Sequence, residues 1–590
     1  MECVGISFYP ITFVFMMSQI FSSIPSAQLI VEYCKRYGIL DVVISPGSRN
    51  AALTIGFSND QSIQAYSIVD ERCAAFFALG MAQKKGKPVA VVCTSGSAIA
   101  NYYPAVTEAY YSNIPLVVIS ADRPKYLIDI GDGQTIQQEN FFQKHVCYAV
   151  NLKDDTCQDP TKSPLSFNAD KLRQAMTQCL EKSMPIHINA AFDEPLYNTE
   201  SALFPEVKEQ LEAVQINKKE VLDAKDDFVK DWNSAERKLV LIGVNHATQI
   251  DESVLEQLAD DPSVIVMTEI TSNVVHQNFF QSIDSILAPI EKSTRKDVLF
   301  EKLQPDMLIT MGGMLVSKKI KKFLRTYKPE QHYHIGPHQA LDTFFCSPKH
   351  LKTRVNSFFD LVSADLKDVV SSYYGFWKPL KDQTDALLES YTAKIPYTDF
   401  KVFSQLFTHL PAYENVHFAN SSTIRYANLF DSPKPINAFS NRGTSGIDGS
   451  TSTAVGFAVA SQQPTTLITG DLSFFYDSNA LWNQYIPAHF KIIIINNSGG
   501  GIFRILPGDK DQAYFQSYFE TRHELTAEPL SQMYGLGYTK IESMDALEEK
   551  LPGFFSSNDK PQIMEIMTPT EVNDEILLNY FNDLVQAFDA

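Results

Sequence analysis

Two polar turns in the last third of the chain carry side chains suited to binding a metal ion. One short apolar run ends near Asp471 and the next near Asn497, 26 residues later. That separation is the length of one strand–helix–strand crossover, which would place both side chains at adjacent strand ends. A carboxylate, an amide oxygen and the free carbonyl of Gly499 are three hard oxygen ligands, half of an octahedral Mg²⁺ shell with room for phosphate oxygens. Either turn alone is an ordinary strand-end turn, so the prediction depends on the pair.

Four arginines provide a second chemical signal. Arg49, Arg123, Arg425 and Arg442 all fall in loops that contain Gly, Ser, Asn or Pro and follow predicted strands. The planar guanidinium can bind a carboxylate through two parallel hydrogen bonds. Most single arginines are solvated surface charges, but this chain is acidic, with 50 Lys and Arg against 69 Asp and Glu. The balance argues against a nucleic-acid-binding protein and is compatible with small anionic substrates at a locally cationic site.

The elements that must position these residues are short apolar strands. Their apolar positions are continuous rather than alternating, which is typical of parallel sheets covered by helices on both faces. Because helical patterns follow the runs, ligands are expected at the carboxyl ends of the strands, and the fold class is predicted as α/β. The predicted strands are Val89–Cys93, Leu116–Ser120, Leu239–Val244, Val264–Met267, Met307–Thr310, Leu467–Thr469 and Ile492–Ile495.

The 590 residues are predicted to form three such α/β blocks, at 26–195, 196–370 and 385–575. Residues 1–25 are interpreted as an N-terminal extension outside these blocks, as from a start codon assigned too early. Its apolar stretch is interrupted by polar residues and has no cationic start, which disfavours a membrane span or a signal peptide.

Cysteine and histidine usage points to a reducing compartment and leaves one alternative metal site. The eight cysteines include no Cys-x-x-Cys pair, which fits a cytoplasmic protein better than a disulfide framework. His332, His334 and His338 form a metal-like cluster, and strand alternation would place the first two on one face. No Cys or carboxylate nearby completes a zinc site, so a structural role is favoured.

Several motifs, in the same order along the chain, resemble those of the 2-succinyl-5-enolpyruvyl-6-hydroxy-3-cyclohexene-1-carboxylate synthase family, thiamine diphosphate enzymes of menaquinone biosynthesis. They cover the first and third blocks densely and the second mainly at MGGMLVSKK. ISPGSR and NRGTSGIDG are far more specific than the Asp/Asn pair, which the whole superfamily shares. The motifs are ISPGSR (Ile44–Arg49), DER (Asp70–Arg72), TSGSA (Thr94–Ala98), SADRP (Ser120–Pro124), the Gln134 region, SNRGTSGIDG (Ser440–Gly449), GDLSFFYD (Gly470–Asp477) and NNSGGGIF (Asn496–Phe503).

The resemblance implies a pyrimidine-binding block, a central block and a diphosphate-binding block. It implies that Glu71 is the catalytic residue and hydrogen-bonds N1′ of the cofactor's aminopyrimidine. The implied metal ligands, for Mg²⁺ or Mn²⁺, are Asp471, Asn497 and Gly499. The other implied cofactor-binding residues are Ser445, Gly446, Ile447, Leu472, Ser473, Ile502 and Phe503. The implied substrate-binding residues are Ser48, Arg49, Arg123, Gln134, Lys318, Lys319, Ser421, Arg425 and Arg442.

The implied activity is that of a transferase. It decarboxylates 2-oxoglutarate and adds the resulting succinyl carbanion equivalent to isochorismate in a 1,4-sense. Both substrates are dicarboxylates, in agreement with the arginine set. The implied assembly is a homodimer or homotetramer with active sites shared between subunits, without nucleic-acid or membrane partners. Two alternatives stay open: another thiamine diphosphate carboligase or decarboxylase of the acetohydroxyacid synthase type, and a catalytically silent sensor of isochorismate or a quinone precursor.

Overall fold

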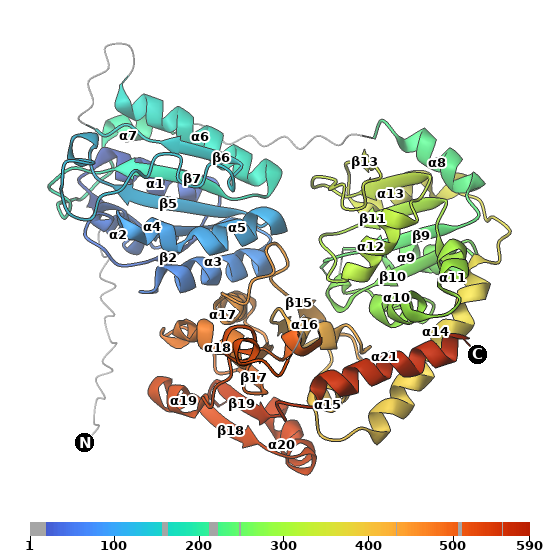
Figure 1. Cartoon of the computed structure of the whole chain (residues 1–590). Helices are drawn as coiled ribbons and strands as arrows, with labels where there is room; N and C mark the ends of the chain where they lie inside the picture. The colour runs from blue at the N-terminus through green and yellow to red at the C-terminus, as the bar shows by residue number, and fades with distance from the viewer. Residues whose placement is uncertain are drawn as a thin grey trace, which may run out of the picture.

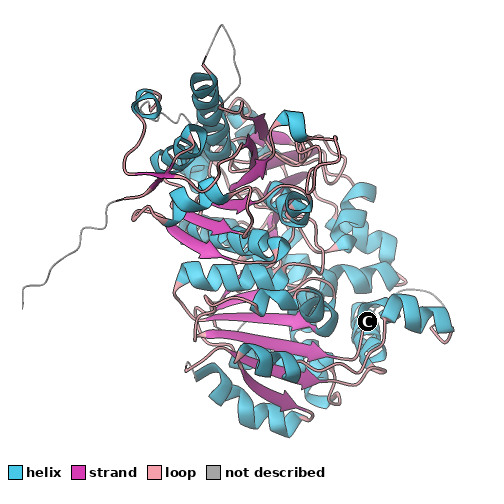
Figure 2. Ribbon diagram, turned by 90° about the vertical axis from the view of Figure 1, so that its left-hand side faces the viewer, coloured by secondary structure: helices cyan, strands magenta, loops and turns pink. Residues whose placement is uncertain are grey.

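Three parallel β-sheets flanked by helices make up the fold (Figures 1 and 2). The computed structural model describes residues 19–155, 163–211, 222–246, 249–431, 434–505, 510–556 and 559–589. Within these three sheets every pair of neighbouring strands is parallel. The predicted α/β class is thereby confirmed.

The first unit contains a six-stranded sheet whose central strands are buried along their whole length. In spatial order the strands are β3 (Gln64–Ser67), β2 (Asp41–Ile44), β4 (Val89–Cys93), β5 (Leu116–Asp122), β7 (Ile186–Ala191) and β6 (Tyr148–Asn151). Its helices are α1 (Pro25–Arg36), α2 (Ala51–Ser58), α3 (Glu71–Lys85), α4 (Ser97–Asn101), α5 (Tyr103–Ser112) and α6 (Pro164–Lys182).

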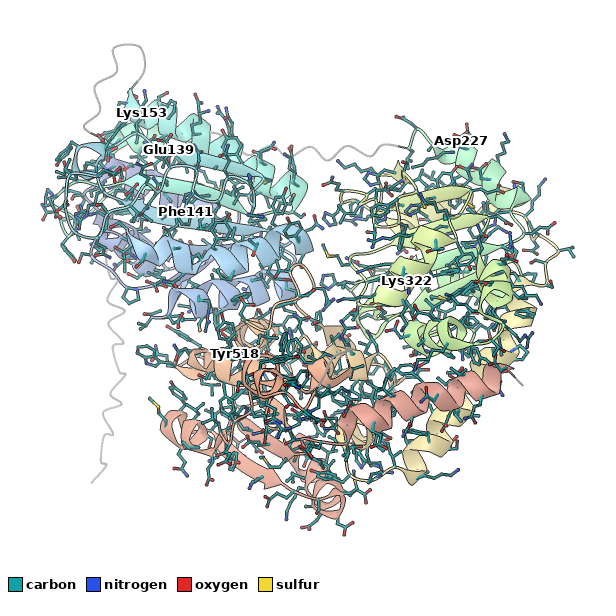
Figure 3. The ribbon with its side chains drawn as sticks, viewed as in Figure 1. Glu139, Phe141, Lys153, Asp227, Lys322 and Tyr518 are labelled. Atoms are coloured by element: carbon teal, nitrogen blue, oxygen red, sulfur yellow. The ribbon has the colours of Figure 1, made fainter. Side chains whose placement is uncertain are left out.

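The second unit contains a five-stranded sheet. Its strands, in spatial order, are β10 (Val264–Thr268), β9 (Lys238–Ile242), β11 (Met307–Met311), β12 (Gln331–Ile335) and β13 (Lys349–Leu351). Its helices are α8 (Lys225–Ser234), α9 (Glu252–Asp260), α10 (Ile283–Lys292), α11 (Lys296–Leu303), α12 (Lys318–Thr326) and α13 (Val355–Val362). Figure 3 labels Lys322 on α12.

The third unit repeats the architecture of the first, with six strands. In spatial order these are β15 (Asn437–Phe439), β14 (Asn415–Phe418), β16 (Thr465–Gly470), β17 (Phe490–Asn496), β19 (Gln562–Met567) and β18 (Gly537–Ile541). Its helices are α15 (Asp399–His409), α16 (Ser422–Ala427), α17 (Ser450–Ser461), α18 (Asp471–Tyr476), α19 (Glu528–Tyr534) and α20 (Met544–Ser556).

Two long helices connect the second and third units. They are α14 (Tyr373–Lys394) and α21 (Asn573–Asp589), and α21 passes beneath the second unit in the view of Figure 1. Tyr580 of α21 lies 3.3 Å from Ser285 of α10 through their hydroxyl groups, and the Asp589 carboxylate accepts a hydrogen bond from Ser293. The C-terminal helix therefore packs against the second unit.

The first and third units meet where α3 packs on α17 (Figure 1). A Cβ on Gly80 of α3 would lie 2.0 Å from the carbonyl oxygen of Thr453, and a Cβ on Gly456 of α17 would lie 2.0 Å from that of Phe77. No side chain fits into such backbone contacts. The two glycines therefore allow the helices to approach each other closely.

All seven predicted strands are present, and most extend one or two residues further than predicted. β4 has the predicted bounds, and β9 begins one residue earlier than predicted and ends two residues earlier, at Ile242. The Gly313 carbonyl oxygen comes within 2.0 Å of where a Cβ on Gly243 would lie, so this position requires glycine. Gly243 and Val244, the last predicted strand residues, lie outside the strand.

The interpretation of residues 1–25 as an extension needs correction at its end. Residues 1–18 lie outside the described residues, but β1 (Phe21–Ser22) pairs with β8 (Thr199–Glu200) in an antiparallel ladder. Ser22 is buried, and α1 begins at Pro25. The folded chain therefore starts before the predicted boundary, because the segment finds a strand partner far along the sequence. Among the described residues, none of the helices combines the length and apolar character needed to span a bilayer.

Candidate functional site

The two predicted metal turns lie side by side at one edge of the third sheet. β16 and β17 are neighbouring parallel strands, and Asp471 begins α18 directly after β16, with 2% of its surface exposed. The backbone N–H of Gly499 donates a hydrogen bond of 2.8 Å to Asp471 Oδ2. The turn after β17 is thus attached to the turn after β16, as expected at the carboxyl ends of adjacent parallel strands.

A buried carboxylate orients the Asn497 side chain. Asn497 Nδ2 donates a hydrogen bond of 2.9 Å to Asp399 Oδ2. Asp399 begins α15, is buried, and also accepts a hydrogen bond of 2.6 Å from Thr568 Oγ1. Burial raises the pKa of Asp399 to about 6. Because the amide group donates to Asp399, its oxygen points elsewhere and is available as a metal ligand.

The backbone conformation and the surroundings of residue 499 leave no room for a side chain. Its φ is +149°, and a Cβ would lie 2.5 Å from the carbonyl oxygen of Glu520. Glu520 itself is buried and paired with Arg504 and Arg522. A side chain at Gly499 would therefore push the turn away from a well-supported segment.

The donor set fits a divalent cation of the magnesium type. It consists of a buried carboxylate, an amide oxygen and a backbone carbonyl, all of them hard oxygen donors. His523 Nε2 lies 3.2 Å from Asp471 Oδ2, and contact with that carboxylate raises the pKa of His523. A buried negative charge needs a cationic partner, which a metal ion bound at these turns would supply.

The loop 440–449 brings further predicted residues next to the metal turns. It connects β15 with α17. Ser473 Oγ donates a hydrogen bond of 2.7 Å to the Ile447 carbonyl, and Asn420 Nδ2 donates one of 2.7 Å to the Gly446 carbonyl. The Ile447 side chain is 37% exposed although it is apolar. Its position beside α18 suits contact with a bound ring.

The remaining predicted cofactor positions flank the same two turns. Leu472 follows Asp471 in α18, and its N–H donates to Asp471 Oδ1 at 2.6 Å. Ser445 has a positive φ of 61°, a conformation that costs energy and is concentrated at functional sites. Ile502 and Phe503 lie in the 3₁₀ turn Gly501–Ile505, directly after the predicted ligand at 499.

Glu71 lies at the first position of α3, in the first unit. Asp70 caps the helix by accepting a hydrogen bond of 3.2 Å from the Cys73 N–H. The Glu71 side chain is half-buried, and its charge adds to the effect of burial in raising the pKa of Cys93 and of Tyr102. Within the described part of the chain, no hydrogen bond or ion pair connects Glu71 with the metal turns.

The residue after Glu71 contacts the third unit. Arg72 Nη2 donates a hydrogen bond of 2.8 Å to the Tyr476 carbonyl, and its guanidinium lies 4.8 Å from the centre of the Tyr476 ring. It also lies 3.9 Å from Asp477, which is fully buried and accepts a hydrogen bond of 2.7 Å from the Ser452 N–H. Burial raises the pKa of Asp477 to about 6. The start of α3 is thus attached to α17 and α18 of the same chain.

Arg49 and Arg123 lie together at the carboxyl edge of the first sheet. Arg49 is buried and donates a hydrogen bond of 2.9 Å to the Phe192 carbonyl, while Arg123 lies 3.5 Å from Asp132. Burial raises the pKa of Asp122, and the charges of Arg49 and Arg123 partly oppose that rise. The charges of both arginines therefore act on the same carboxylate.

Ser48 and Gln134 lie at the same edge. Ser48 is exposed, directly before Arg49. Gln134 has a positive φ of 59°, and its carbonyl accepts a hydrogen bond of 3.0 Å from Ser95 Oγ, beyond the end of β4. The four predicted residues of this unit thus come from the ends of three adjacent strands, or from a loop attached to one of them.

Arg425 and Arg442 form a second cationic pair, in the third unit. Burial lowers the pKa of Arg442, and the nearby charge of Arg425 lowers it further while Glu269 opposes the change. Arg442 Nη1 donates a hydrogen bond to Asn420 Oδ1. Ser421, which precedes α16, has a positive φ of 73°. Two close cations beside a strained backbone are suited to binding an anion.

The two predicted lysines have different surroundings. Both begin α12, after the cap Ser317, whose side chain accepts the Ile320 N–H. Lys318 is exposed and has no ion-pair partner among the described residues. Lys319 Nζ lies 2.6 Å from Glu291. Lys318 is therefore the one of the two whose charge is available to a ligand.

Sequence reasoning missed the buried acids that support the site. Glu108, Glu269 and Asp399 are each at most 5% exposed. Glu269 accepts hydrogen bonds of 2.7 Å from the N–H groups of Val316 and Ser317 at the start of α12, and burial raises its pKa to about 7. Each is an acidic residue within an apolar pattern, and such a mismatch is the signal that could have identified them.

Two histidines of the cluster contact one hydroxyl group on the neighbouring strand. His332 and His334 share one strand face, since both contact the Thr310 hydroxyl at 3.0 Å. Burial lowers the pKa of each to about 4. Within the described ranges, no group of three or more His, Cys, Asp or Glu is arranged to bind a metal ion.

Comparison with known proteins finds a matching family model and several similar proteins. A family model for the N-terminal TPP binding domain of thiamine pyrophosphate enzymes matches residues 25–146. The chain is 51% identical over 579 residues to a 2-succinyl-5-enolpyruvyl-6-hydroxy-3-cyclohexene-1-carboxylate synthase of Christiangramia forsetii, covering 95% of this chain and 99% of the relative. Proteins with the same name from Flavobacterium johnsoniae (50% over 567 residues, 96% and 100% covered) and Porphyromonas gingivalis (35% over 576 residues, 96% and 98% covered) also match.

Proposed function

Because this chain belongs to the 2-succinyl-5-enolpyruvyl-6-hydroxy-3-cyclohexene-1-carboxylate synthase family, we propose that it decarboxylates 2-oxoglutarate and transfers the succinyl unit to isochorismate. The products are 2-succinyl-5-enolpyruvyl-6-hydroxy-3-cyclohexene-1-carboxylate and CO₂. The observation that carries the proposal is the convergence of Asp471, Asn497 and Gly499 at two adjacent strand ends, with Ile447 beside them.

The proposed cofactor is thiamine diphosphate with Mg²⁺, and Mn²⁺ is an alternative metal. When bound, thiamine diphosphate supplies a nucleophilic carbon and an electron sink for the decarboxylation of a 2-oxo acid. Asp471, Asn497 and the Gly499 carbonyl bind the metal ion. Glu71 shares a proton with N1′ of the aminopyrimidine, which its half-buried position beside Cys93 permits.

The remaining cofactor-binding residues surround the metal turns. Ile447, Ile502 and Phe503 supply apolar contacts to the ring system and exclude water from it. Four further residues of the same loops border the diphosphate group. These residues are Ser445, Gly446, Leu472 and Ser473.

The two cationic pairs suit two dicarboxylate substrates. Ser421, which directly precedes α16, and Arg425 of that helix bind the distal carboxylate of 2-oxoglutarate, next to Arg442. Arg49 and Arg123 bind isochorismate. Ser48, Gln134 and Lys318 complete the isochorismate-binding side of the site. Lys319 lies beside Lys318 in this part of the site, and its ammonium group is paired with Glu291.

The proposed assembly is a homodimer or homotetramer with shared sites. The absence of a hydrogen bond or ion pair between Glu71 and the metal turns within the described chain supports this arrangement, since Glu71 of one subunit would then act at the metal turns of another. The first block is proposed to bind the pyrimidine, and the third the diphosphate. The thiols of Cys34, Cys73, Cys93 and Cys179 are free and buried, which supports a cytoplasmic location.

CO₂ release measured with thiamine diphosphate and Mg²⁺ tests the proposal. We expect release from 2-oxoglutarate that is stimulated by isochorismate, with formation of the coupled product. Release from pyruvate in preference to 2-oxoglutarate would indicate an acetohydroxyacid synthase-like enzyme. Binding of isochorismate without any CO₂ release would indicate a silent sensor and overturn the proposal.

A further inference from the structure

We propose that Glu108 is a positioning residue for the active site. It lies in α5 of the first unit, yet its carboxylate bonds the loop 440–449 of the third unit. Through that loop it sets the positions of Arg442 and Ile447, on which substrate and cofactor binding depend. The role rests on the proposed function for what the loop binds, but the contact itself is independent of it.

All acceptor positions of the Glu108 carboxylate are filled. Oε1 accepts hydrogen bonds of 2.7 Å from the Gly443 N–H and of 2.7 Å from Ser112 Oγ. Oε2 accepts 2.7 Å and 2.9 Å bonds from the N–H and hydroxyl groups of Thr444. Glu108 is 1% exposed. Charge-assisted hydrogen bonds in such a buried site are strong and geometrically specific.

The loop and α5 are in backbone contact as well. A Cβ on Gly443 would lie 2.5 Å from the Glu108 carbonyl oxygen and 2.8 Å from Ser112 Oγ. Only a glycine permits this approach. The loop is therefore seated directly on α5, and a displacement of α5 would move it.

The seated residues are flanked on both sides by predicted site residues. Arg442 precedes Gly443, and the charges of Glu108, Glu269 and Arg425 all act on its guanidinium. These three residues belong to the first, second and third units, respectively. Each unit therefore contributes a charged residue to the surroundings of Arg442. Ile447 follows three residues after Thr444 and is attached to α18 by Ser473.

Hydrogen bonds within the third unit hold the loop on either side of residues 443 and 444, and Glu108 bonds these two residues. Asn420 Nδ2 donates hydrogen bonds of 2.8 Å and 2.7 Å to the carbonyls of Asn441 and Gly446. Residues 443 and 444 lie between those two points and are bonded by Glu108. Removing its carboxylate would leave two backbone N–H groups without their acceptor, which favours a different loop conformation.

The direct test compares Glu108→Ala and Glu108→Gln with the matched control Ser112→Ala. The control removes one hydrogen bond to the same carboxylate and leaves the three hydrogen bonds from the loop in place. In both Glu108 variants we expect KM for 2-oxoglutarate to rise about tenfold or more, with KM for isochorismate changed less than about twofold. Thiamine diphosphate affinity, measured by fluorescence titration of the cofactor-free protein, should fall in parallel. The control should resemble wild type.

A purely structural role would lower thermal stability without this selective change. Folded Glu108 variants with wild-type affinity for 2-oxoglutarate and for thiamine diphosphate would overturn the proposal. If Glu108→Ala does not fold, Thr444→Val decides the matter. This substitution removes the hydrogen bond from the Thr444 hydroxyl group to the Glu108 carboxylate and leaves Glu108 itself in place. We expect an intermediate loss of cofactor affinity, and an unchanged affinity would count against the role.

A second experiment places the effect at one site of a shared-site dimer. A hybrid of a Glu71→Gln subunit and an Asp471→Ala subunit has one functional site, which uses the third unit of the Glu71→Gln subunit. Adding Glu108→Ala to that subunit should reduce activity about tenfold, whereas adding it to the Asp471→Ala subunit should not. Equal effects from both placements would overturn the assignment of Glu108 to its own chain's loop. An inactive parent hybrid would contradict the shared-site assembly instead, and the single-variant titrations would still decide the role of Glu108.

Discussion

Asp399 accepts a hydrogen bond from Asn497, a residue 98 positions away in the sequence, at 2.9 Å. The bond uses the amide group of Asn497 as donor, so that the amide oxygen is directed away from Asp399. Residues that orient a metal ligand in this way commonly matter almost as much as the ligand itself.

Removing the Asp399 carboxylate should weaken metal binding. We expect Asp399→Ala to lower the Mg²⁺-dependent affinity for thiamine diphosphate about 10- to 100-fold, because the Asn497 amide loses its fixed orientation. Asp471→Ala should lose more, since it removes a charged ligand. Calorimetric titration measures both. Thr568→Val is the matched control, because it removes the other hydrogen bond to Asp399 and leaves Asn497 in place.

Cofactor activation should depend on the Glu71 carboxyl group. Glu71→Gln is expected to bind thiamine diphosphate but to lose C2 proton exchange and turnover, because an amide cannot share the N1′ proton equivalently. Hydrogen–deuterium exchange at C2, followed by NMR, measures the effect. An exchange rate equal to that of wild type would show that Glu71 does not activate the cofactor.

The two cationic pairs should serve different substrates. Loss of a charge-assisted contact costs about 1.5–3 kcal/mol, or about 10- to 150-fold in kcat/KM. Arg425→Ala should raise KM mainly for 2-oxoglutarate, and Arg123→Ala mainly for isochorismate. Steady-state kinetics with each substrate varied in turn distinguishes the two. Equal penalties on both substrates from both variants would mean that the division of the site is wrong.

The contact of α3 with α17 should tolerate no side chain. Gly456→Ala is expected to lower the free energy of unfolding by more than about 2 kcal/mol, because its Cβ would lie 2.0 Å from the Phe77 carbonyl oxygen. Gly553 in α20 provides the control, since no atom lies within 4 Å of its would-be Cβ. Gly553→Ala should raise the free energy of unfolding by about 0.5–1 kcal/mol, because alanine has a higher helix propensity than glycine. Denaturant unfolding compares them, and equal effects would contradict the close approach.

The buried Asp477 should make stability fall as pH rises. Its pKa is about 6 in the folded protein against 3.8 as the ordinary value, so the folded state retains a proton that the unfolded state releases. The stabilisation that the neutral Asp477 carboxyl group provides is fully present below about pH 4 and is lost as pH rises through 6. Asp477→Asn has no such titration. Its unfolding free energy relative to wild type should therefore increase by about 2–3 kcal/mol between pH 4 and 7, as measured by urea unfolding. A pH-independent difference would show that Asp477 stays ionised in the fold.

Seven of the strands, the α/β class and the proximity of the turns at Asp471 and Gly499 could be predicted from local sequence patterns. Continuous apolar runs such as Ile492–Ile495 must be buried on both faces, and a crossover of fixed length places Asp471 and Asn497 at adjacent strand ends. Both inferences depend on local periodicity and on the chirality and length of the connection. They require no knowledge of how the three units meet.

The pairing of buried polar groups depends on how the three units pack and could not be predicted from local patterns. Glu108 bonds Gly443 across 335 residues, and Phe21–Ser22 finds its strand partner near residue 200. Likewise, Lys319 is paired with Glu291 whereas Lys318 is not. A periodic pattern indicates that a residue is buried, but the identity of its hydrogen-bond partner depends on the packing of separate units. That packing is governed by shape and by close backbone approach at residues such as Gly80 and Gly456, and these are properties of surfaces that no local stretch of sequence contains.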